Sequence, residues 1–346
     1  MKNTVSHLLE QNYENMEILL VENGSGDDSL LLCRQLESMV ENISVYQSTP
    51  GTTFARRKGI ECSRGKYILF LDQDDAYISS DAVTRMVSAI EEEGVDIIQF
   101  AHYKSWKGVR KKNGYNFEKQ VFDREDILDF QIKGILGFGW DERIVLNTLV
   151  WNKIYKSEIL KEIADQIEWP LFFCEDAFLN MLAFFNPHTE KVCVLDDAYY
   201  QWTGGVGFTS SKDSSFALLK DYIYYKPCTQ TNIISNGCKS NILNACYWDS
   251  LNVYRWTIYG YFYKGLKKNE IINRIQEIEN FDYIRDAKEK LRNAPLKDVN
   301  SLQIPDIDFI TSNYSAEEYY LWCQSTLPKR RINNRIKSMV KRLLFH

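Results

Sequence analysis

The stretch from Lys66 to Asp75 limits the fold more than any other part of the chain, because an apolar run of strand-forming residues ends in three carboxylates. The run Tyr-Ile-Leu-Phe-Leu is typical of a buried strand in an α/β sheet. Open α/β sheets bind their ligands beyond the carboxyl ends of such strands, and here that end carries Asp72, Asp74 and Asp75.

The spacing of these acids indicates a metal site. Three carboxylates this close repel one another unless a cation lies between them, and carboxylate oxygens suit Mg²⁺ or Mn²⁺, ions that commonly bring phosphates with them. The alternative is that the acids only form a turn or cap the next helix. Capping needs one acid rather than three, and Asp81 is available for it.

Composition narrows the class of protein. The 346 residues, 45% of them hydrophobic, predict one large or two modest globular domains. A net charge of −5 gives no general attraction to nucleic acid, so we expect no such partner. The eight cysteines show no metal-ligand spacing, no signal peptide opens the chain, and no apolar run is long enough to span a bilayer. Reduced thiols and a cytoplasmic location are therefore expected.

The first hundred residues alternate between helical and strand patterns, which predicts a parallel sheet covered by helices. Glu22 and Asn23 end one strand and the Asp72 cluster ends another, so both should border one crevice. The predicted helices are Val5–Gln11, Leu30–Met39, Thr52–Cys62 and Ser80–Glu92, and the predicted strands are Met16–Val21, Ile43–Tyr46, Tyr67–Leu71 and Val95–Phe100.

Beyond residue 100 the pattern is less regular. The basic segment Trp106–Asn116 predicts a loop or hairpin tip, and Gly204–Gly207 predicts either a lid over a ligand or an ordinary surface loop. From Ser214 onward the chain is mostly helical in pattern. Further strands are predicted at Leu149–Tyr155 and Val192–Tyr200, and helices from Ser157 and over Ala177–Phe185.

Five motifs in order resemble a known family: Val-Glu-Asn-Gly-Ser, Ala-Arg-Arg-x-Gly-Ile, Gly-x-Tyr-Ile-x-Phe-x-Asp-x-Asp-Asp, Trp-Asn-Lys-x-Tyr and Glu-Asp-x-x-x-Asn. Over residues 4 to about 210 the chain is similar to the family-2 glycosyltransferases, inverting enzymes that use nucleotide sugars and often build bacterial surface glycans such as lipopolysaccharide. The resemblance implies an α/β fold of GT-A type, with a mostly parallel sheet flanked by helices and a Rossmann-like nucleotide-binding half. With the residue pattern further along, it predicts this catalytic domain in residues 1–212; the pattern itself predicts a mainly helical region in 213–327 and a basic amphipathic helix in 328–346.

On the donor side, the resemblance implies that Glu22 and Asn23 contact the base of the nucleotide. The family usually has Asp-Asp there, and an Asn can still hydrogen-bond a uracil edge. Arg56 matches an arginine near the nucleotide and would make charge-assisted bonds to a diphosphate. From the residue alone, Arg56 could equally lie on a solvated helix face.

The same resemblance assigns the three acids. Asp74 would bind the metal directly, Asp72 would lie nearer the ribose or a metal-bound water, and Asp75 would be a third ligand. The Mg²⁺ or Mn²⁺ ion would neutralise charge on the leaving nucleoside diphosphate.

Glu175 and Asp176 match the pair that supplies the catalytic base. Asp176 would deprotonate the acceptor hydroxyl, with Glu175 in support. By sequence alone both acids could instead cap the following helix. Trp151, Asn152 and Lys153 match a segment on the acceptor side, and their alternative is a core tryptophan with a polar turn.

One departure from the family concerns the start of the chain. Family members open with a strand of the type Val-Ile-Ile-Pro-Val-Tyr-Asn, whereas Met1 here falls inside the helix that follows it. Two neighbouring strands should then lack hydrogen-bonding partners. We expect the start to be incomplete, the alternatives being impaired donor binding or another element in the gap.

The C-terminal segment 329–344 is basic with one apolar helical face, which predicts contact with an anionic membrane or docking on the protein's own core. Membrane contact would place the enzyme peripherally at the inner face of the membrane. The overall prediction is transfer of a sugar from a UDP-sugar to a glycan or lipid-linked acceptor. The alternatives are a non-catalytic family member that binds a glycan or a partner, and a nucleotidyltransferase, which would favour a Gly-rich phosphate loop that we do not find.

Overall fold

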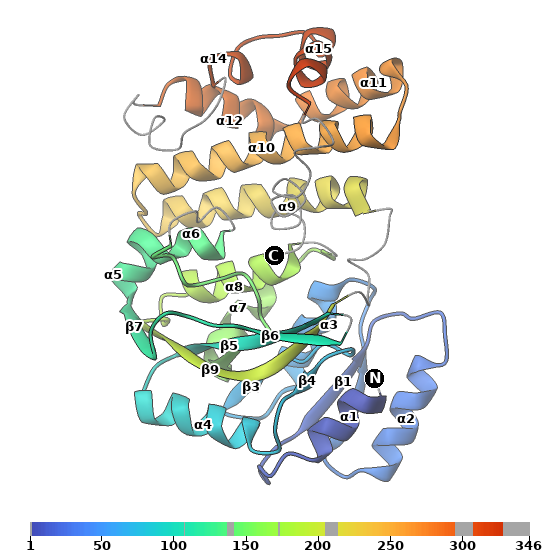
Figure 1. The fold of residues 1–346 in the computed structure, drawn as a ribbon, viewed down its shortest axis with the longest axis vertical. Coiled ribbons are helices and arrows are strands. Elements are labelled where there is room, and N and C mark those ends of the chain that lie inside the picture. The colour runs from blue at the N-terminus through green and yellow to red at the C-terminus, as the bar shows by residue number, and fades with distance from the viewer. Residues whose placement is uncertain are drawn as a thin grey trace. The chain divides into compact units, whose positions relative to one another are not determined.

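The computed structural model describes residues 2–106, 108–136, 142–171, 174–204, 214–294 and 307–327. They form two compact units, one of residues 1–135 with 140–212 and the other of residues 136–139 with 213–346 (Figure 1). The predicted basic helix 328–346 and residues 205–207 of the predicted lid lie outside the described residues.

The first unit contains a small parallel sheet of β1 (Ile18–Glu22) and β2 (Ile43–Gln47). Helix α2 (Ser29–Met39) connects these strands, and α1 (Lys2–Leu9) and α3 (Thr52–Cys62) precede and follow them. Apolar side chains from this region form their own core, made of Val5, Ile18, Cys33, Ile43 and Val45. Because these apolar residues are buried together, the apolar pattern of the sequence predicted these strands and helices.

The second sheet of the first unit has seven strands in the order β3-β8-β5-β9-β4, with β6 paired to β5 and β7 to β9. The strands are β3 (Tyr67–Leu69), β4 (Ala76–Tyr77), β5 (Ile97–Trp106), β6 (Val109–Asn113), β7 (Lys119–Asp123), β8 (Lys153–Lys156) and β9 (Lys191–Thr203). The pair β5–β9 is parallel, and the other pairs are antiparallel. Because β3 and β5 both run against β8, the carboxyl ends of β3, β5 and β9 point to the same edge of the sheet.

Helices cover both faces of this sheet (Figure 1). Helix α4 (Ala82–Glu93) packs its apolar side against Ile98 and Phe100 of β5, and it ends at Gly94 in the left-handed conformation. The opposite face carries α7 (Ser157–Ile163) and α8 (Glu175–Phe185). Short helices complete the unit: α5 (Arg124–Asp126), a π-helical turn (Ile127–Gln131), α6 (Ile132–Ile135) and a 3₁₀ turn (Ala164–Gln166).

The two sheets of the first unit are not joined by strand pairing within the described residues. Within the described residues, β1 pairs with β2 alone and β3 with β8 alone. A side chain joins the two sheets instead: the Glu17 carboxylate accepts hydrogen bonds from the backbone N–H groups of Arg64, at 2.6 Å, and Gly65, at 3.0 Å. The edges of β1 and β3 therefore carry backbone groups without a ladder partner among the described strands.

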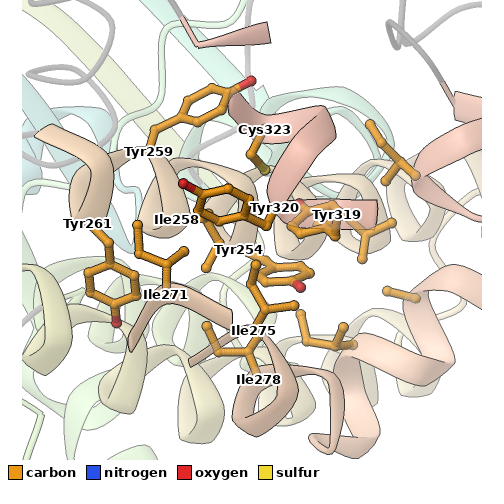
Figure 2. Packing of buried hydrophobic residues seen from close by; sticks show 14 of the residues in the cluster. Tyr254, Ile258, Tyr259, Tyr261, Ile271, Ile275, Ile278, Tyr319, Tyr320 and Cys323 are labelled. Atoms are coloured by element: carbon orange, nitrogen blue, oxygen red, sulfur yellow. The ribbon is translucent and has the colours of Figure 1, made fainter. Parts of the chain in front are cut away.

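The second unit is helical, as the pattern after Ser214 predicted. It comprises α9 (Ser214–Ser235), α10 (Ser240–Lys264), α11 (Lys268–Glu279), α12 (Asp282–Arg292), α14 (Ile307–Ile310) and α15 (Ala316–Thr326). Tyrosine and isoleucine side chains of α10, α11 and α15 form its core (Figure 2). None of the described helices is both long enough and apolar enough to cross a membrane.

The structure corrects some predicted elements. The run Leu149–Tyr155 is a strand only from Lys153, because the preceding residues form a turn around the buried Lys153 ammonium. Strand β6 was not predicted as a strand, since every residue of it is exposed and no apolar alternation marks it. The helix predicted to begin at Ala177 begins at Glu175.

Candidate active site

The loop after β1 fixes the start of α3. The Glu22 carboxylate accepts a hydrogen bond from the Ser25 N–H, and this bond lowers the pKa of Glu22. The Asn23 Oδ1 accepts one from the N–H of Gly51 at 2.8 Å. Gly51 has φ 137°, and a Cβ there would lie 2.7 Å from the Pro170 Cβ, so glycine is required at this close approach. Both side chains that were predicted to bind the nucleotide base thus accept hydrogen bonds from backbone N–H groups, and their contact with a base stays a prediction.

Arg56, one turn into α3, gathers acids that are far apart in the sequence. Its guanidinium forms an ion pair with Asp176 and lies 3.8 Å from Glu175 Oε1 and 3.9 Å from Asp72 Oδ1. Only 10% of the Arg56 side chain is exposed. The structure therefore brings the predicted diphosphate-binding arginine, the two predicted catalytic acids and one predicted metal-site acid into one cluster.

The charges in this cluster perturb one another. Burial alone would lower the pKa of Arg56, but Asp176, Glu175 and Asp72 outweigh it and raise that pKa, so the guanidinium stays charged. Burial and then the Asp176 charge raise the pKa of Glu175 to about 8, which keeps this carboxyl largely protonated at neutral pH. Burial raises the pKa of Asp72 to about 6, against the opposing effect of Arg56 and with help from Asp176 and Asp74.

The first turn of α8 presents the two predicted catalytic acids. Cys174, just before them, has φ 58°, a left-handed conformation that is uncommon for a non-glycine residue. The Asp176 Oδ2 accepts a hydrogen bond from the N–H of Val150 at 3.4 Å, and its backbone oxygen accepts one from the amide of Asn180. The side chain of Asp176 is thus held between Arg56 and the loop before β8.

Asp75 has a different environment from Asp72. Its Oδ2 accepts a hydrogen bond from the Tyr200 hydroxyl and its Oδ1 one from the N–H of Thr203, both at 2.7 Å. Burial raises the pKa of Asp75 to about 7. The Tyr200 oxygen in turn accepts the N–H of Asp72 at 3.3 Å, so this tyrosine fastens the acidic turn to the end of β9. Asp75 therefore supports the turn, and its role as a metal ligand stays a prediction.

The residues present fit a divalent cation in their chemistry. Within the described chain no three acidic, histidine or cysteine side chains are arranged closely enough to form a metal site by themselves. Even so, Asp72, Glu175 and Asp176 all lie within 4 Å of one guanidinium, so several carboxyl groups share a single cation there. The Asp72 side chain is 44% exposed and thus accessible to a ligand.

Trp151, Asn152 and Lys153 are all buried. Trp151 stacks on Tyr200 with ring centroids 4.5 Å apart. The Lys153 ammonium donates to the Asn147 backbone oxygen at 2.9 Å and to Leu149, and burial lowers its pKa far below the usual value. These residues shape the loop that carries Val150, and their direct contact with an acceptor stays a prediction.

Tyr200 and Asn180 are site residues that the sequence analysis did not assign. Asn180 is fully buried and donates to both Thr148 and Asp176, while its Oδ1 accepts the Tyr155 hydroxyl at 2.9 Å. Its position in the motif Glu-Asp-x-x-x-Asn, four residues after Asp176 on one helix face, was the available signal.

Comparison with known proteins identifies the family of the N-terminal part of the chain. Residues 1–163 match the family model described as Glycosyl transferase family 2. This part of the chain belongs to glycosyl transferase family 2. Glu175 and Asp176 lie beyond the matched residues, so their assignment rests on the geometry and on the resemblance of their motif.

Two curated relatives and one solved structure show how far the likeness extends. The uncharacterized glycosyltransferase EpsJ of Bacillus subtilis is 28% identical over 57% of this chain and 55% of its own length. The poly(ribitol-phosphate) beta-glucosyltransferase of Bacillus spizizenii is 31% identical over 54% of this chain and 27% of its own. The chain thus spans about half or less of the length of these two relatives.

The fragment 1–349 of S. aureus TarS, solved in complex with UDP, superposes with a TM-score of 0.58 at 19% identity. It covers 93% of this chain and 87% of that one. This likeness confirms the predicted GT-A-type fold, with the sheet mixed rather than mostly parallel in its pairing.

Proposed function

We propose that the chain transfers a sugar, with inversion, from a UDP-sugar to a hydroxyl of a glycan or lipid-linked acceptor, assisted by Mg²⁺ or Mn²⁺. The observation that carries the proposal is the convergence of Asp72, Glu175 and Asp176 on Arg56. The family match and the glycosyltransferase relatives support sugar transfer, and the TarS fragment bound to UDP supports the choice of donor.

Each residue has a defined part in the proposed reaction. Asp176 accepts the proton of the acceptor hydroxyl, which attacks the anomeric carbon from the side opposite the diphosphate. Glu175, largely protonated at neutral pH, does not compete for that proton and leaves Asp176 as the base. Asp74 and Asp72 would hold the divalent ion, which when bound neutralises charge developing on the leaving diphosphate.

Arg56 links the donor side to the base. In this structure Arg56 is paired with Asp176. A donor diphosphate offers Arg56 an alternative partner with bidentate geometry. Donor binding would therefore loosen the pair between Arg56 and Asp176 and leave the Asp176 carboxylate free to contact the acceptor hydroxyl.

Isothermal titration of UDP, with and without Mn²⁺, tests the proposal on the wild-type chain and on Asp74→Ala. The matched control is Asp81→Ala, because Asp81 lies in the same segment but bonds to Ser79 before α4. We expect metal-dependent UDP binding that is lost in Asp74→Ala and kept in Asp81→Ala. Equal binding by all three chains would contradict the placement of the metal.

A second candidate, a non-catalytic family member that binds a glycan or a partner, is favoured by one observation. The side-chain oxygens of Glu22 and Asn23, the predicted base-binding residues, accept hydrogen bonds from backbone N–H groups. Absence of UDP and GDP binding in the same titration, with glycan binding retained, would select this candidate.

A further inference from the structure

The described segment 143–152 runs into β8 without forming a helix or a strand of its own. Buried side chains from other elements bind its backbone groups instead. The Gln131 Oε1 accepts the N–H of Val145 at 2.9 Å, and the Gln99 Nε2 donates to the Val145 oxygen at 2.7 Å. The Gln99 Oε1 also accepts the N–H of Asn147 at 3.0 Å. The surrounding core therefore fixes the path of a segment that has no backbone ladder.

Lys153 holds the far end of this segment. Its side chain is fully buried. The ammonium donates to the backbone oxygens of Asn147, at 2.9 Å, and Leu149. It also donates to the side-chain oxygens of Asn147 and Asn152, each at 3.1 Å. All of these acceptors are neutral oxygens, and burying a charge among neutral partners is costly, so a buried ammonium of this kind is typical of a functional site.

One peptide unit connects Lys153 to Asp176. The unit between Leu149 and Val150 accepts a hydrogen bond from the Lys153 ammonium through its C=O. Its N–H donates to the Asp176 Oδ2 at 3.4 Å. In a planar trans peptide the C=O and the N–H point in opposite directions, so an ammonium that fixes one group also fixes the other. The peptide dipole then has its negative end at the ammonium and its positive end at the carboxylate.

The electrostatics of the two charged groups agree with this connection. Burial lowers the pKa of Lys153 well below its usual value, and the charge of Asp176 acts in the opposite direction. The two groups therefore interact across the peptide unit. On its other side, the Asp176 Oδ1 is paired with Arg56. The carboxylate is thus held by one cation directly and by a second cation through a polarised N–H group.

We propose that Lys153 is a positioning residue that acts on Asp176 through the peptide unit between Leu149 and Val150. The inference rests on the proposed function, because it takes Asp176 as the base. When a donor diphosphate binds Arg56, the Val150 N–H keeps the Asp176 Oδ2 in place and leaves Oδ1 to accept the proton of the acceptor hydroxyl. Lys153 then serves the reaction through the position of Asp176 rather than through a contact with the acceptor.

The first experiment compares the wild type with Lys153→Met, in UDP release from the UDP-sugar that the wild type uses and in titration of UDP. The matched control is Lys156→Met on the same strand, because the Lys156 ammonium pairs with Asp96 at 2.7 Å. We expect kcat to fall about ten- to a hundredfold in Lys153→Met, as loss of an oriented hydrogen bond to a charged group predicts. The KM for the donor and the Kd of UDP should stay within about twofold, and Lys156→Met should keep kcat and KM.

A second readout needs no turnover. Exchange of the Val150 N–H with water is followed by NMR on the full chain with selectively labelled valine amides. We expect slow exchange in the wild type and in Lys156→Met, and exchange at least about tenfold faster in Lys153→Met and in Asp176→Ala.

Asn147→Ala keeps the test decisive if thermal unfolding shows that Lys153→Met does not fold. This change removes one side-chain acceptor of the Lys153 ammonium and leaves the ammonium itself in place. We expect it to speed the exchange of the Val150 N–H and to lower kcat in the same direction, by a smaller factor than Lys153→Met.

Three results would overturn the proposal. The first is a folded Lys153→Met with the kcat of the wild type. The second is exchange of the Val150 N–H that stays as slow as in the wild type in Lys153→Met, or in Asn147→Ala if Lys153→Met does not fold. The third is a fall in kcat accompanied by an equal weakening of UDP binding, which would indicate general damage to the fold.

The two readouts separate this inference from the proposed function. A wild type that releases UDP from no UDP-sugar would remove the proposed reaction. Exchange of the Val150 N–H that still depends on both Lys153 and Asp176 would then leave the connection between these two residues standing.

Discussion

Replacing Arg56 by methionine removes the cation that three carboxylates share, while keeping a side chain of similar length. Breaking one partner of a buried ion pair costs about 3–5 kcal/mol. Asp72 is 44% exposed and the contacts to Glu175 and Asp72 are near 4 Å, so water relieves part of this loss. We therefore expect the lower end, about 3 kcal/mol at about pH 8, or a fall in Tm of roughly 6–12 °C for a unit of this size.

The size of the effect should depend on pH. The pKa values of Asp72 and Glu175 are raised in the folded protein. The stability that each group contributes in its protonated form is therefore lost as pH rises from the group's ordinary pKa through its raised pKa. Arg56 lowers both of those pKa values, and its removal raises them further. The difference between Arg56→Met and the wild type should therefore be smaller at about pH 5 than at about pH 8, because it grows only as pH rises above about 6, the wild-type pKa of Asp72.

Urea denaturation at both pH values measures this difference, because urea does not screen charge. Arg57→Met is the matched control: Arg57 is the next residue, and its ion pairs with Glu61 and Asp165 are on the surface, where such pairs contribute about 0–1 kcal/mol. A loss in Arg56→Met below about 1 kcal/mol, or one of equal size at both pH values, would refute the reasoning.

Three further predictions concern single side chains. Glu175→Gln should keep most of any transfer activity at neutral pH, since the pKa of Glu175 is raised to about 8. The variant should also lack the fall in stability that the wild type shows as pH rises from about 4.5 to about 8. Inactivity at neutral pH would contradict this. Tyr200→Phe should lose about 1–3 kcal/mol in urea denaturation, because Asp75 stays buried without one partner, and a change below about 0.5 kcal/mol would show that the hydroxyl is dispensable. In the second unit, Lys226→Met should lose about 3–5 kcal/mol by leaving the Asp249 carboxylate buried and unpaired; the double variant with Asp249→Leu should recover most of it, and failure to recover would indicate a packing defect.

Sequence patterns predicted the elements whose cores are local. The strands β1 and β2 and the helices α2 and α3 lie within about two residues of their predicted bounds. Apolar side chains of β1, β2 and α2 pack into one core whose residues are close in the sequence, which a local pattern can predict. Strands β6 and β7 have largely exposed side chains and are held by pairing with β5 and β9. Such pairing is a tertiary contact, and no local sequence pattern predicts it.

In the candidate site, too, the sequence predicted local features but not the tertiary contacts between them. The motifs identified Asp72, Glu175, Asp176 and Arg56 one by one, but their meeting around one guanidinium depends on where α3 and α8 pack. The engagement of Asp75 by Tyr200 depends on the pairing of β4 with β9 and was not predictable from either segment. The burial of Lys153 likewise could not be predicted from the sequence, since lysine side chains usually lie on the surface.

The most direct test of the account is a transfer assay that follows release of UDP from a panel of UDP-sugars, with Mn²⁺ and a glycan acceptor present. We predict release that requires metal and acceptor, is abolished in Asp176→Asn and in Asp74→Ala, and persists at neutral pH in Glu175→Gln. Release that is unchanged in Asp176→Asn would contradict the assignment of the acids around Arg56 as the catalytic centre.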